Sequence, residues 1–318
     1  MSSLLSMNGA IFESKHGTIE GEVSCGVFET RCRKNNKIGF CNINNDVCVP
    51  FMYNMAYAFD QKTGQSRVFE SDGAKLINLR NEAIMCAGKD DIGYMHDNRI
   101  RYKTDGLYGF CDQFGRPIIE RHFSYAQDFA CGLAAVQYPN QDEYYYINSV
   151  GAIAHGPYDS FGLAEAGYSS SGIAVHNTDR GTSSIIDVNG KTTAVLDELY
   201  ITSFKDWTTT ARRSNGRHIY IDIFGNQVIL DDFNDARRFL NGYARVMREN
   251  RWALCDIHGG IVTVENPNFE PCSFTNGLLR AKHISGRFVF TDFAYNNIFQ
   301  RDYVWASDFS EGYALVDI

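Results

Sequence analysis

Short apolar runs alternate with polar turn residues along the whole chain, and no stretch keeps the spacing of an amphipathic helix. In residues 217–246, His218 to Asp222 and Val228 to Leu230 carry the β-branched and aromatic residues that strands prefer. Gly242 to Val246 alternates as a half-buried strand does. Between the first two runs, Asp222 can cap backbone amides and Gly225 tolerates a positive φ. The pattern predicts a three-stranded antiparallel meander.

This unit recurs. The phrase Phe239 to Val246 returns as Phe274 to Ala281 and as Phe309 to Val316, in steps of 35 residues. A second phrase, apolar residues followed by Asp or Asn, two variable residues and Gly, places its Gly-equivalent position at residues 17, 45, 73, 115, 151, 190, 225, 259 and 294. The spacing is regular after about residue 107 and irregular before it, and the register of residues 74–106 stays open. A fixed period in this range indicates a repeat architecture.

We therefore expect an all-β chain with a tandem array of about eight to nine three-stranded repeats of ~35 residues. Two arrangements fit: an open β superhelix or solenoid, and a closed β-propeller. We favour the open array, because nine units are many for a propeller and three strands per unit are few. In favour of closure, a turn unit at residues 11–19 and the final strand at residues 312–318 are complementary. Residues 1–106 are expected to be divergent repeats or a cap, and residues 107–318 regular repeats, in one continuous body.

The repeats resemble the WG-repeat (KWG-repeat) family. The best copy runs from Tyr108-Gly-Phe-Cys-Asp-Gln-Phe-Gly115 through Phe123 and Phe129 to Gly132-Leu-Ala-Ala-Val136. The resemblance is strong from about residue 107 and weaker before it. The Trp-Gly pair of the family is nowhere intact, since it reads Ile38-Gly39, Tyr108-Gly109 and Trp252-Ala253. The resemblance implies a diverged member with a repeat fold and a role in recognition, and it carries no catalytic residue.

The composition narrows the range of expected partners and locations. The net charge is −8, and the chain has no Lys/Arg run, so we expect neither nucleic acid nor an anionic membrane as partner. No segment has the length of a membrane span, and the first residues do not form a signal peptide, so a cytoplasmic protein is expected. Leaderless secretion stays open. We expect another protein as the partner, and the oligomeric state is left open.

Candidate chemistry is sparse. Cys41, Cys111 and Cys255 share one repeat position with aliphatic residues, which indicates core thiols rather than metal ligands or disulfides. Aspartates such as Asp112 and Asp222 occur once per repeat, which favours turn capping over calcium binding. No nucleophile elbow, phosphate loop or dinucleotide fingerprint is present. We predict no catalytic residue, metal or cofactor. The function expected is a non-catalytic protein-binding scaffold, for instance a partner-specific inhibitor or immunity-type protein; the alternative is an enzyme or translocated effector with a site that motifs do not reveal.

The binding surface is expected where the repeat is interrupted, because insertions in repeat proteins map to loops. The intervals of 36 and 39 residues, from 115 to 151 and from 151 to 190, mark the middle of the chain, where polar loops stand around residues 137–143, 164–171 and 176–182. These loops carry Tyr138, Tyr168, Asp179 and Arg180, and Tyr and Arg are frequent binding hot spots. We predict these four residues as the partner-binding site.

Overall fold

The computed structural model describes residues 2–71, 73–85, 91–159, 169, 172–177, 182–201, 204 and 207–318. These residues form strands, turns and irregular segments without a helix, which confirms the all-β prediction. In this part of the chain there is accordingly no helix of the length and apolarity that crossing a membrane requires.

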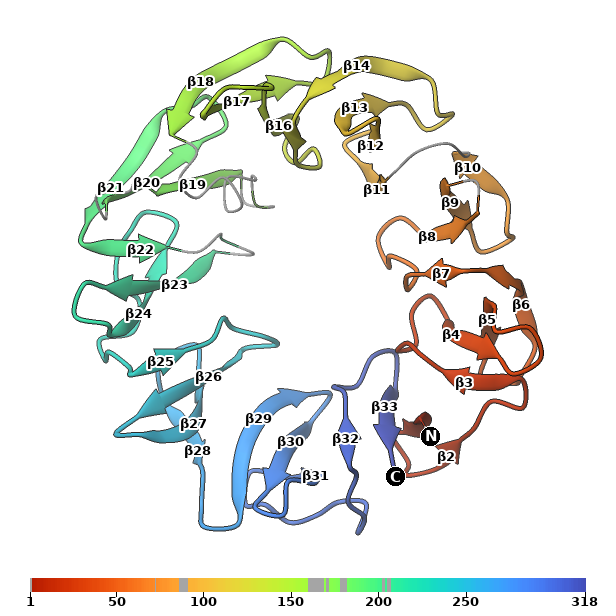
Figure 1. Cartoon of the computed structure of the whole chain (residues 1–318). Helices are drawn as coiled ribbons and strands as arrows, with labels where there is room; N and C mark the ends of the chain where they lie inside the picture. The colour runs from red at the N-terminus through yellow and green to blue at the C-terminus, as the bar shows by residue number, and fades with distance from the viewer. Residues whose placement is uncertain are drawn as a thin grey trace. The chain divides into compact units, whose positions relative to one another are not determined.

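The chain divides into two compact units, residues 1–94 with 263–318 and residues 95–262. We number the small antiparallel sheets in chain order (Figure 1). The first unit holds sheet 1 with β3 (Gly17–Ile19), β4 (Val27–Cys32), β5 (Ile38–Asn42) and β6 (Val47–Tyr53), sheet 2 with β7 (Met55–Ala56), β8 (Gln65–Glu70), β9 (Gly73–Asn78) and β10 (Ala83–Met85), sheet 8 with β29 (Phe269–Thr275), β30 (Leu278–His283) and β31 (Phe288–Thr291), and sheet 9 with β32 (Trp305–Ala306), β33 (Tyr313–Asp317), β1 (Ser2–Ser6) and β2 (Ile11–Phe12).

The second unit holds the five sheets between them, although β11 begins and β28 ends in the first unit. They are sheet 3 with β11 (Asp91–His96), β12 (Arg99–Thr104), β13 (Leu107–Cys111) and β14 (Pro117–Phe123), sheet 4 with β15 (Tyr125–Ala126), β16 (Leu133–Gln137), β17 (Glu143–Asn148) and β18 (Ile153–Asp159), sheet 5 with β19 (Ile173–Asn177), β20 (Thr182–Asp187) and β21 (Thr192–Asp197), sheet 6 with β22 (Leu199–Ile201), β23 (Thr208–Arg213) and β24 (His218–Asp222), and sheet 7 with β25 (Asp235–Ala236), β26 (Tyr243–Arg248), β27 (Arg251–Asp256) and β28 (Ile261–Val264).

The two ends of the chain complete one sheet. Residues 2–6 of β1 pair antiparallel with residues 313–317 of β33, so sheet 9 takes two strands from each end (Figure 1). Nine successive sheets, the ninth shared by both termini, have the strand connectivity of a nine-bladed β-propeller. The open solenoid is therefore wrong, and the alternative propeller topology is the one found. An open array would leave the terminal strands as unpaired edges, whereas here they pair with each other.

The expected three strands per repeat are also wrong for most sheets. Six sheets of the described chain have four strands and three have three. The missed strand is the edge strand at which each sheet begins, which is only two residues long in β7, β15, β25 and β32. In β25 it lies in the polar segment 231–238, where no apolar alternation marks it.

The repeat is more regular than the sequence predicted. In every repeat, a residue with positive φ ends the turn that follows the third strand position. These residues are 9, 45, 81, 115, 151, 190, 225, 259 and 295, in steps of 36, 36, 34, 36, 39, 35, 34 and 36. Three predicted positions are corrected: Gly17 lies in β3, Gly73 begins β9, and the last turn ends at Tyr295 rather than at residue 294. The turns were missed because Ser6 replaces the capping Asp in the ninth sheet and Asn81 replaces Gly in the second. Asn adopts the left-handed region more readily than other non-glycine residues.

The cores lie between neighbouring sheets. One cluster joins Phe110 and Phe123 of sheet 3 to Phe129, Val136 and Ile147 of the next repeat. Cys41, Cys111 and Cys255 are fully buried and unpaired in disulfides, which confirms their prediction as core thiols.

Candidate functional site: a row of exposed turns

In each of these turns, the side chain of the first residue accepts hydrogen bonds from the main-chain amides of the turn. The Asp222 carboxylate accepts hydrogen bonds from the amides of Phe224 (2.9 Å) and Asn226 (2.8 Å), and the Gly225 amide donates to the Asp222 carbonyl (3.0 Å). The same pair of amide contacts is made by Asn42, Asn78, Asp112, Asn148, Asp187, Asp256 and Asp292. The turn-capping interpretation is confirmed. Within the described ranges no group of three or more His, Cys, Asp or Glu side chains could hold a metal ion.

In the second unit, the turns of sheets 4 to 7 pack on the preceding sheet. A Cβ added to Gly225 would lie 3.1 Å from the Leu196 side chain and 3.2 Å from Ala194, both on β21. A Cβ added to Gly259 would lie 2.7 Å from Ile229. Gly151 contacts Ile119 and Gly190 contacts His155 in the same way. The turns of sheets 4 to 7 are therefore held at equivalent levels of their preceding sheets, as a continuous row.

This row presents apolar side chains to solvent. One exposed apolar residue stands in each of the five turns of the second unit, with exposed fractions of 65% for Phe114, 70% for Val150, 37% for Val188, 66% for Phe224 and 55% for Ile257. The turn itself needs only a capping side chain and a residue tolerant of positive φ, so nothing in its geometry requires an apolar residue there. We define these five residues as the turn row.

We call the turns between the first two strands of a sheet, such as those at Asp97 and Gly132, the inner turns. Because neighbouring strands are antiparallel, the inner turns lie at the same end of the sheet as the turn row. They are also tied from sheet to sheet. The Asp97 carboxylate accepts a hydrogen bond from the Gly132 amide (2.7 Å). The Arg99 guanidinium donates twice to the Ser149 carbonyl, at 2.9 and 2.7 Å, and so reaches the turn of the next sheet beside Val150. These contacts make the surface around the turn row pre-organised.

A second feature of this unit is a cavity of about 430 Å³ beside Arg101, lined also by His96, Tyr125, Gln127 and Asp128. Arg101 donates from Nε to the Asp128 carboxylate (3.0 Å) and from Nη1 to the Ala126 carbonyl (2.8 Å). The guanidinium thus joins sheet 3 to sheet 4 and is already paired.

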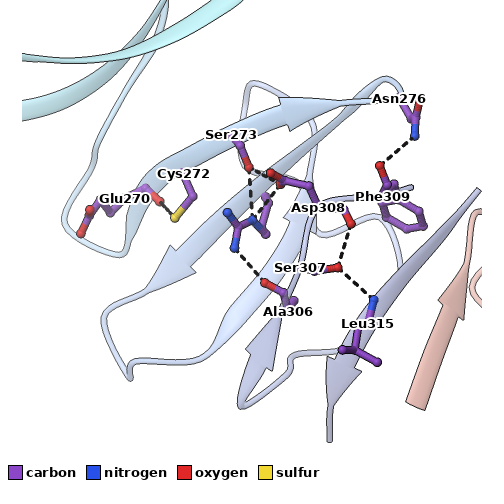
Figure 2. A network of polar contacts seen from close by, with 10 residues as sticks. Glu270, Cys272, Ser273, Asn276, Ala306, Ser307, Asp308, Phe309 and Leu315 are labelled. Atoms are coloured by element: carbon purple, nitrogen blue, oxygen red, sulfur yellow. Dashed lines mark hydrogen bonds and ion pairs between the residues drawn. The ribbon is translucent and has the colours of Figure 1, made fainter. Parts of the chain in front are cut away.

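The same joint recurs in the first unit (Figure 2). Arg280 donates from Nε to Asp308 (2.9 Å) and from Nη1 to the Ala306 carbonyl (2.8 Å). Ser273 also donates to the Asp308 carboxylate. Both arginines stand three residues after the glycine-like end of an inner turn, and both partners stand at equivalent places of the next sheet. The Arg–Asp joint is therefore a structural element of the repeat, and Arg101 and Asp128 do not mark a catalytic centre.

Of the four residues predicted to bind a partner, the structure describes only Tyr138. Its ring is half-buried, with its centroid 5.2 Å from that of Phe123, 5.7 Å from Tyr145 and 5.8 Å from His122. Burial raises the pKa of its hydroxyl. Tyr168, Asp179 and Arg180 lie outside the described residues, so the loop site stays a prediction. The turn row was missed, although its signal is in the sequence: an apolar residue between the capping Asp or Asn and the Gly.

Comparisons with known proteins agree with this repeat. The family model "WG containing repeat" matches residues 108–138 and 220–252. No curated protein matches the chain in sequence. Among solved structures, the computationally designed Ika8 protein superposes with a TM-score of 0.50 at 13% identity, covering 91% of this chain and 98% of its own. BamB from Moraxella catarrhalis gives 0.43 at 10% identity (80% and 89% covered), and Hsv2 from Kluyveromyces lactis gives 0.42 at 10% identity (87% and 98% covered). The likeness to Ika8 concerns the fold alone.

Proposed function

Since this chain is a diverged WG-repeat protein, we propose that it is a non-catalytic scaffold that binds another protein through the turn row of its second unit. The observation that carries the proposal is the exposed apolar residue in all five turns of that unit. Isolated exposed apolar residues are normal on a protein surface, but a row that recurs in the same turn of successive sheets, at its second or third residue, is typical of an interaction surface.

The partner proposed is a protein rather than a nucleic acid. Phe114, Val150, Phe224 and Ile257 offer apolar area, and aromatic anchors carry much of the energy of protein interfaces. The net charge of −8 opposes binding to phosphate backbones. A partner-specific inhibitor or immunity-type protein is one form of this function, and a cytoplasmic location is part of the proposal.

The test begins with the intact chain as bait and mass spectrometry of the bound proteins. The stoichiometric partner is then titrated against a variant with Phe114→Ser, Val150→Ser, Phe224→Ser and Ile257→Ser. We expect a loss of affinity of roughly thirty-fold or more, because one anchor residue contributes about 2 kcal/mol.

The matched control replaces exposed apolar residues away from the turns: Leu230→Ser, Val195→Ser and Ile153→Ser. It should bind like wild type. A turn-row variant that binds as tightly as wild type, with the control or a Tyr138→Ala, Tyr168→Ala, Asp179→Ala and Arg180→Ala variant losing affinity instead, would overturn the assignment to the turn row. In the second case the interrupted loops are the binding surface.

A further inference from the structure

Sheet 6 carries a cavity of about 300 Å³, lined by Glu198, Tyr200, Arg212, Arg213 and Ser214. Tyr200 of β22 pairs with Arg212 of β23, so the two side chains stand on the same face of the sheet. The Tyr200 side chain is 41% exposed, and Arg212 is exposed as well. The cavity is therefore open to solvent and places a guanidinium group beside an aromatic ring.

The polar groups that line the cavity differ in whether they have a partner. Arg213 donates from Nη2 to the Gln227 side-chain oxygen (3.0 Å), and the Ser214 hydroxyl donates to the Glu198 carboxylate (3.3 Å). Arg212, in contrast, makes no hydrogen bond and no ion pair with any residue that the structure describes. Its guanidinium group is therefore the one cation of this cavity that is free to bind a ligand.

Sheet 1 shows what an arginine binds at this position of the repeat. Arg31 of β4 and Arg212 of β23 are equivalent, because each stands four residues after the residue that pairs with the capping Asn or Asp of the turn. In sheet 1, the two carboxylate oxygens of Glu20 accept hydrogen bonds from Arg31, at 2.5 and 2.9 Å. Glu20 stands two residues after the residue that pairs with the arginine, and the sequence has the uncharged Thr202 at that place in sheet 6. Sheet 6 thus keeps the guanidinium group and lacks the carboxylate.

The charges around the cavity favour a carboxylate over a phosphate. A guanidinium group fits either anion, but the Glu198 carboxylate in the wall repels a dianion more strongly than a monoanion. On the other side of Arg212, β24 places His218. Burial lowers the pKa of His218, the Asp235 carboxylate acts in the opposite direction, and the Arg212 and Arg237 charges lower it further. The positive charge of Arg212 therefore acts on its neighbours, as expected of a cation without a counter-ion.

We propose that this cavity binds a carboxylate group, held by the Arg212 guanidinium, with the remainder of the ligand against the Tyr200 ring. The carboxylate is the shared chemistry of an acidic side chain on a protein and of a free small carboxylate. Arg212 pairs with the first residue of β24, whereas Phe224 of the turn row follows the last, so the cavity and the turn row lie at opposite ends of sheet 6. The site stands whether or not the turn row binds a protein.

The test uses phenylacetate as the probe at pH 6.5, with the uncharged phenylacetamide as the control at equal ionic strength. In protein labelled with ¹⁵N-arginine, the Nε resonance that disappears in Arg212→Gln belongs to Arg212. We expect phenylacetate to shift this resonance in a saturable manner, whereas phenylacetamide leaves it unchanged. Calorimetric titration should show at least a tenfold loss of affinity in Arg212→Gln. Arg238 is likewise exposed but lies outside the cavity, so Arg238→Gln is the matched control and should bind normally.

A second arm compares phenylacetate with the blocked peptide acetyl-Gly-Glu-Gly-amide. Saturable binding of either supports the site; binding of the peptide at least tenfold tighter assigns it to a protein side chain, and any other ratio assigns it to a small free carboxylate. The proposal is overturned if neither probe moves the Arg212 resonance, or if inorganic phosphate binds more tightly than both carboxylates. It is also overturned if Arg212→Gln, shown to be folded by circular dichroism, binds the probes as wild type does.

Discussion

At the scale of the residue, the glycine that ends several of the turns meets two demands. Gly225 has φ of +84°, which side chains resist, and it also packs against Leu196 and Ala194 of the preceding sheet. Gly216 has nearly the same φ, +82°, but nothing within 4 Å of where its Cβ would be. Substitutions at the two positions therefore separate the cost of backbone strain from the cost of disturbed packing.

We therefore expect Gly225→Val to lower the free energy of unfolding by roughly 1–3 kcal/mol, and by more than Gly216→Val does. Urea denaturation of both variants measures the difference. Equal losses would show that the contact with the preceding sheet contributes nothing.

Glu29 gives a dependence of stability on pH that is opposite to that of ordinary carboxylates. Burial, and to a lesser extent the Glu20 charge, raise its pKa in the folded chain to about 7, above the ordinary value of 4.5. A raised pKa stabilises the fold at pH values below 4.5, and this contribution is lost as the pH rises through 7. Between pH 5 and pH 8.5 the wild type should lose about 1–2 kcal/mol of unfolding free energy that Glu29→Gln does not lose, after allowance for the partial exposure of the group. Denaturation of wild type and variant at both pH values checks this; parallel pH dependences would contradict it.

Several residue roles were predictable from the sequence and others were not. The capping aspartates and the buried cysteines were predicted, because each occupies one repeat position with a clear chemical preference. The turn ending at Asn45 was placed correctly, whereas those ending at Asn81 and Tyr295 were missed or misplaced, because non-glycine residues occupy the left-handed conformation there. The apolar residues of the turn row can be read from the sequence, but their exposure cannot, because it depends on which side of the turn meets the neighbouring sheet.

At the scale of the element, the Arg–Asp joint connects one sheet to the next. The Arg280 and Asp308 side chains are 21% and 29% exposed, and the arginine also binds the Ala306 carbonyl. Arg287 and Asp302 form a more exposed pair in the same unit, at 35% and 54%. The two pairs allow a matched comparison.

Arg280→Ala should cost about 1–3 kcal/mol of unfolding free energy, because it leaves the Ala306 carbonyl without its donor and the Asp308 carboxylate with only Ser273 as a donor. Arg287→Ala should cost less than about 1 kcal/mol, as for most surface pairs. Thermal or urea unfolding of the two variants measures both losses of unfolding free energy. If Arg287→Ala proves as costly as Arg280→Ala, the joint is not a special connection.

The burial of the strand cysteines can be tested with a thiol reagent. Cys41, Cys111 and Cys255 are buried, whereas Cys131 is exposed in an inner turn. A thiol reagent should therefore modify Cys131 quickly in the native protein and the other three only slowly, with full modification after denaturation. Peptide mass spectrometry assigns the labelled sites, and rapid native labelling of the three strand cysteines would contradict the register.

Most of the longer strands were predictable because their apolar runs alternate or contain β-branched residues, but the strand predicted at Val228 to Leu230 does not form. The edge strands at which the sheets begin were not predictable. Tyr125–Ala126 and Asp235–Ala236 are two residues long, and they become strands only because the neighbouring strand offers them a partner. A pairing decided by tertiary contact leaves no local pattern to read.

At the scale of the whole molecule, both ends of the chain build sheet 9. Besides the β1–β33 ladder, the Glu311 carboxylate accepts hydrogen bonds from the amides of Cys25 and Gly26 (both 2.8 Å), and Ser310 donates to the Val23 carbonyl (2.9 Å). The C-terminal repeat is thereby fastened to the first sheet. The sequence could not decide between an open and a closed array, since complementary ends are compatible with both.

The central claim is that the two ends of the chain pair within one sheet, and a cross-link tests it most directly. Ser3 lies opposite Val316 in the ladder. In a Ser3→Cys and Val316→Cys variant, mild oxidation should give an intramolecular disulfide between the two introduced cysteines, identified by mass spectrometry of the linked peptides. The bond should also raise the free energy of unfolding by roughly 2–4 kcal/mol. Failure of this disulfide to form in the folded monomer, or its appearance only between two molecules, would contradict a ninth sheet completed by both termini.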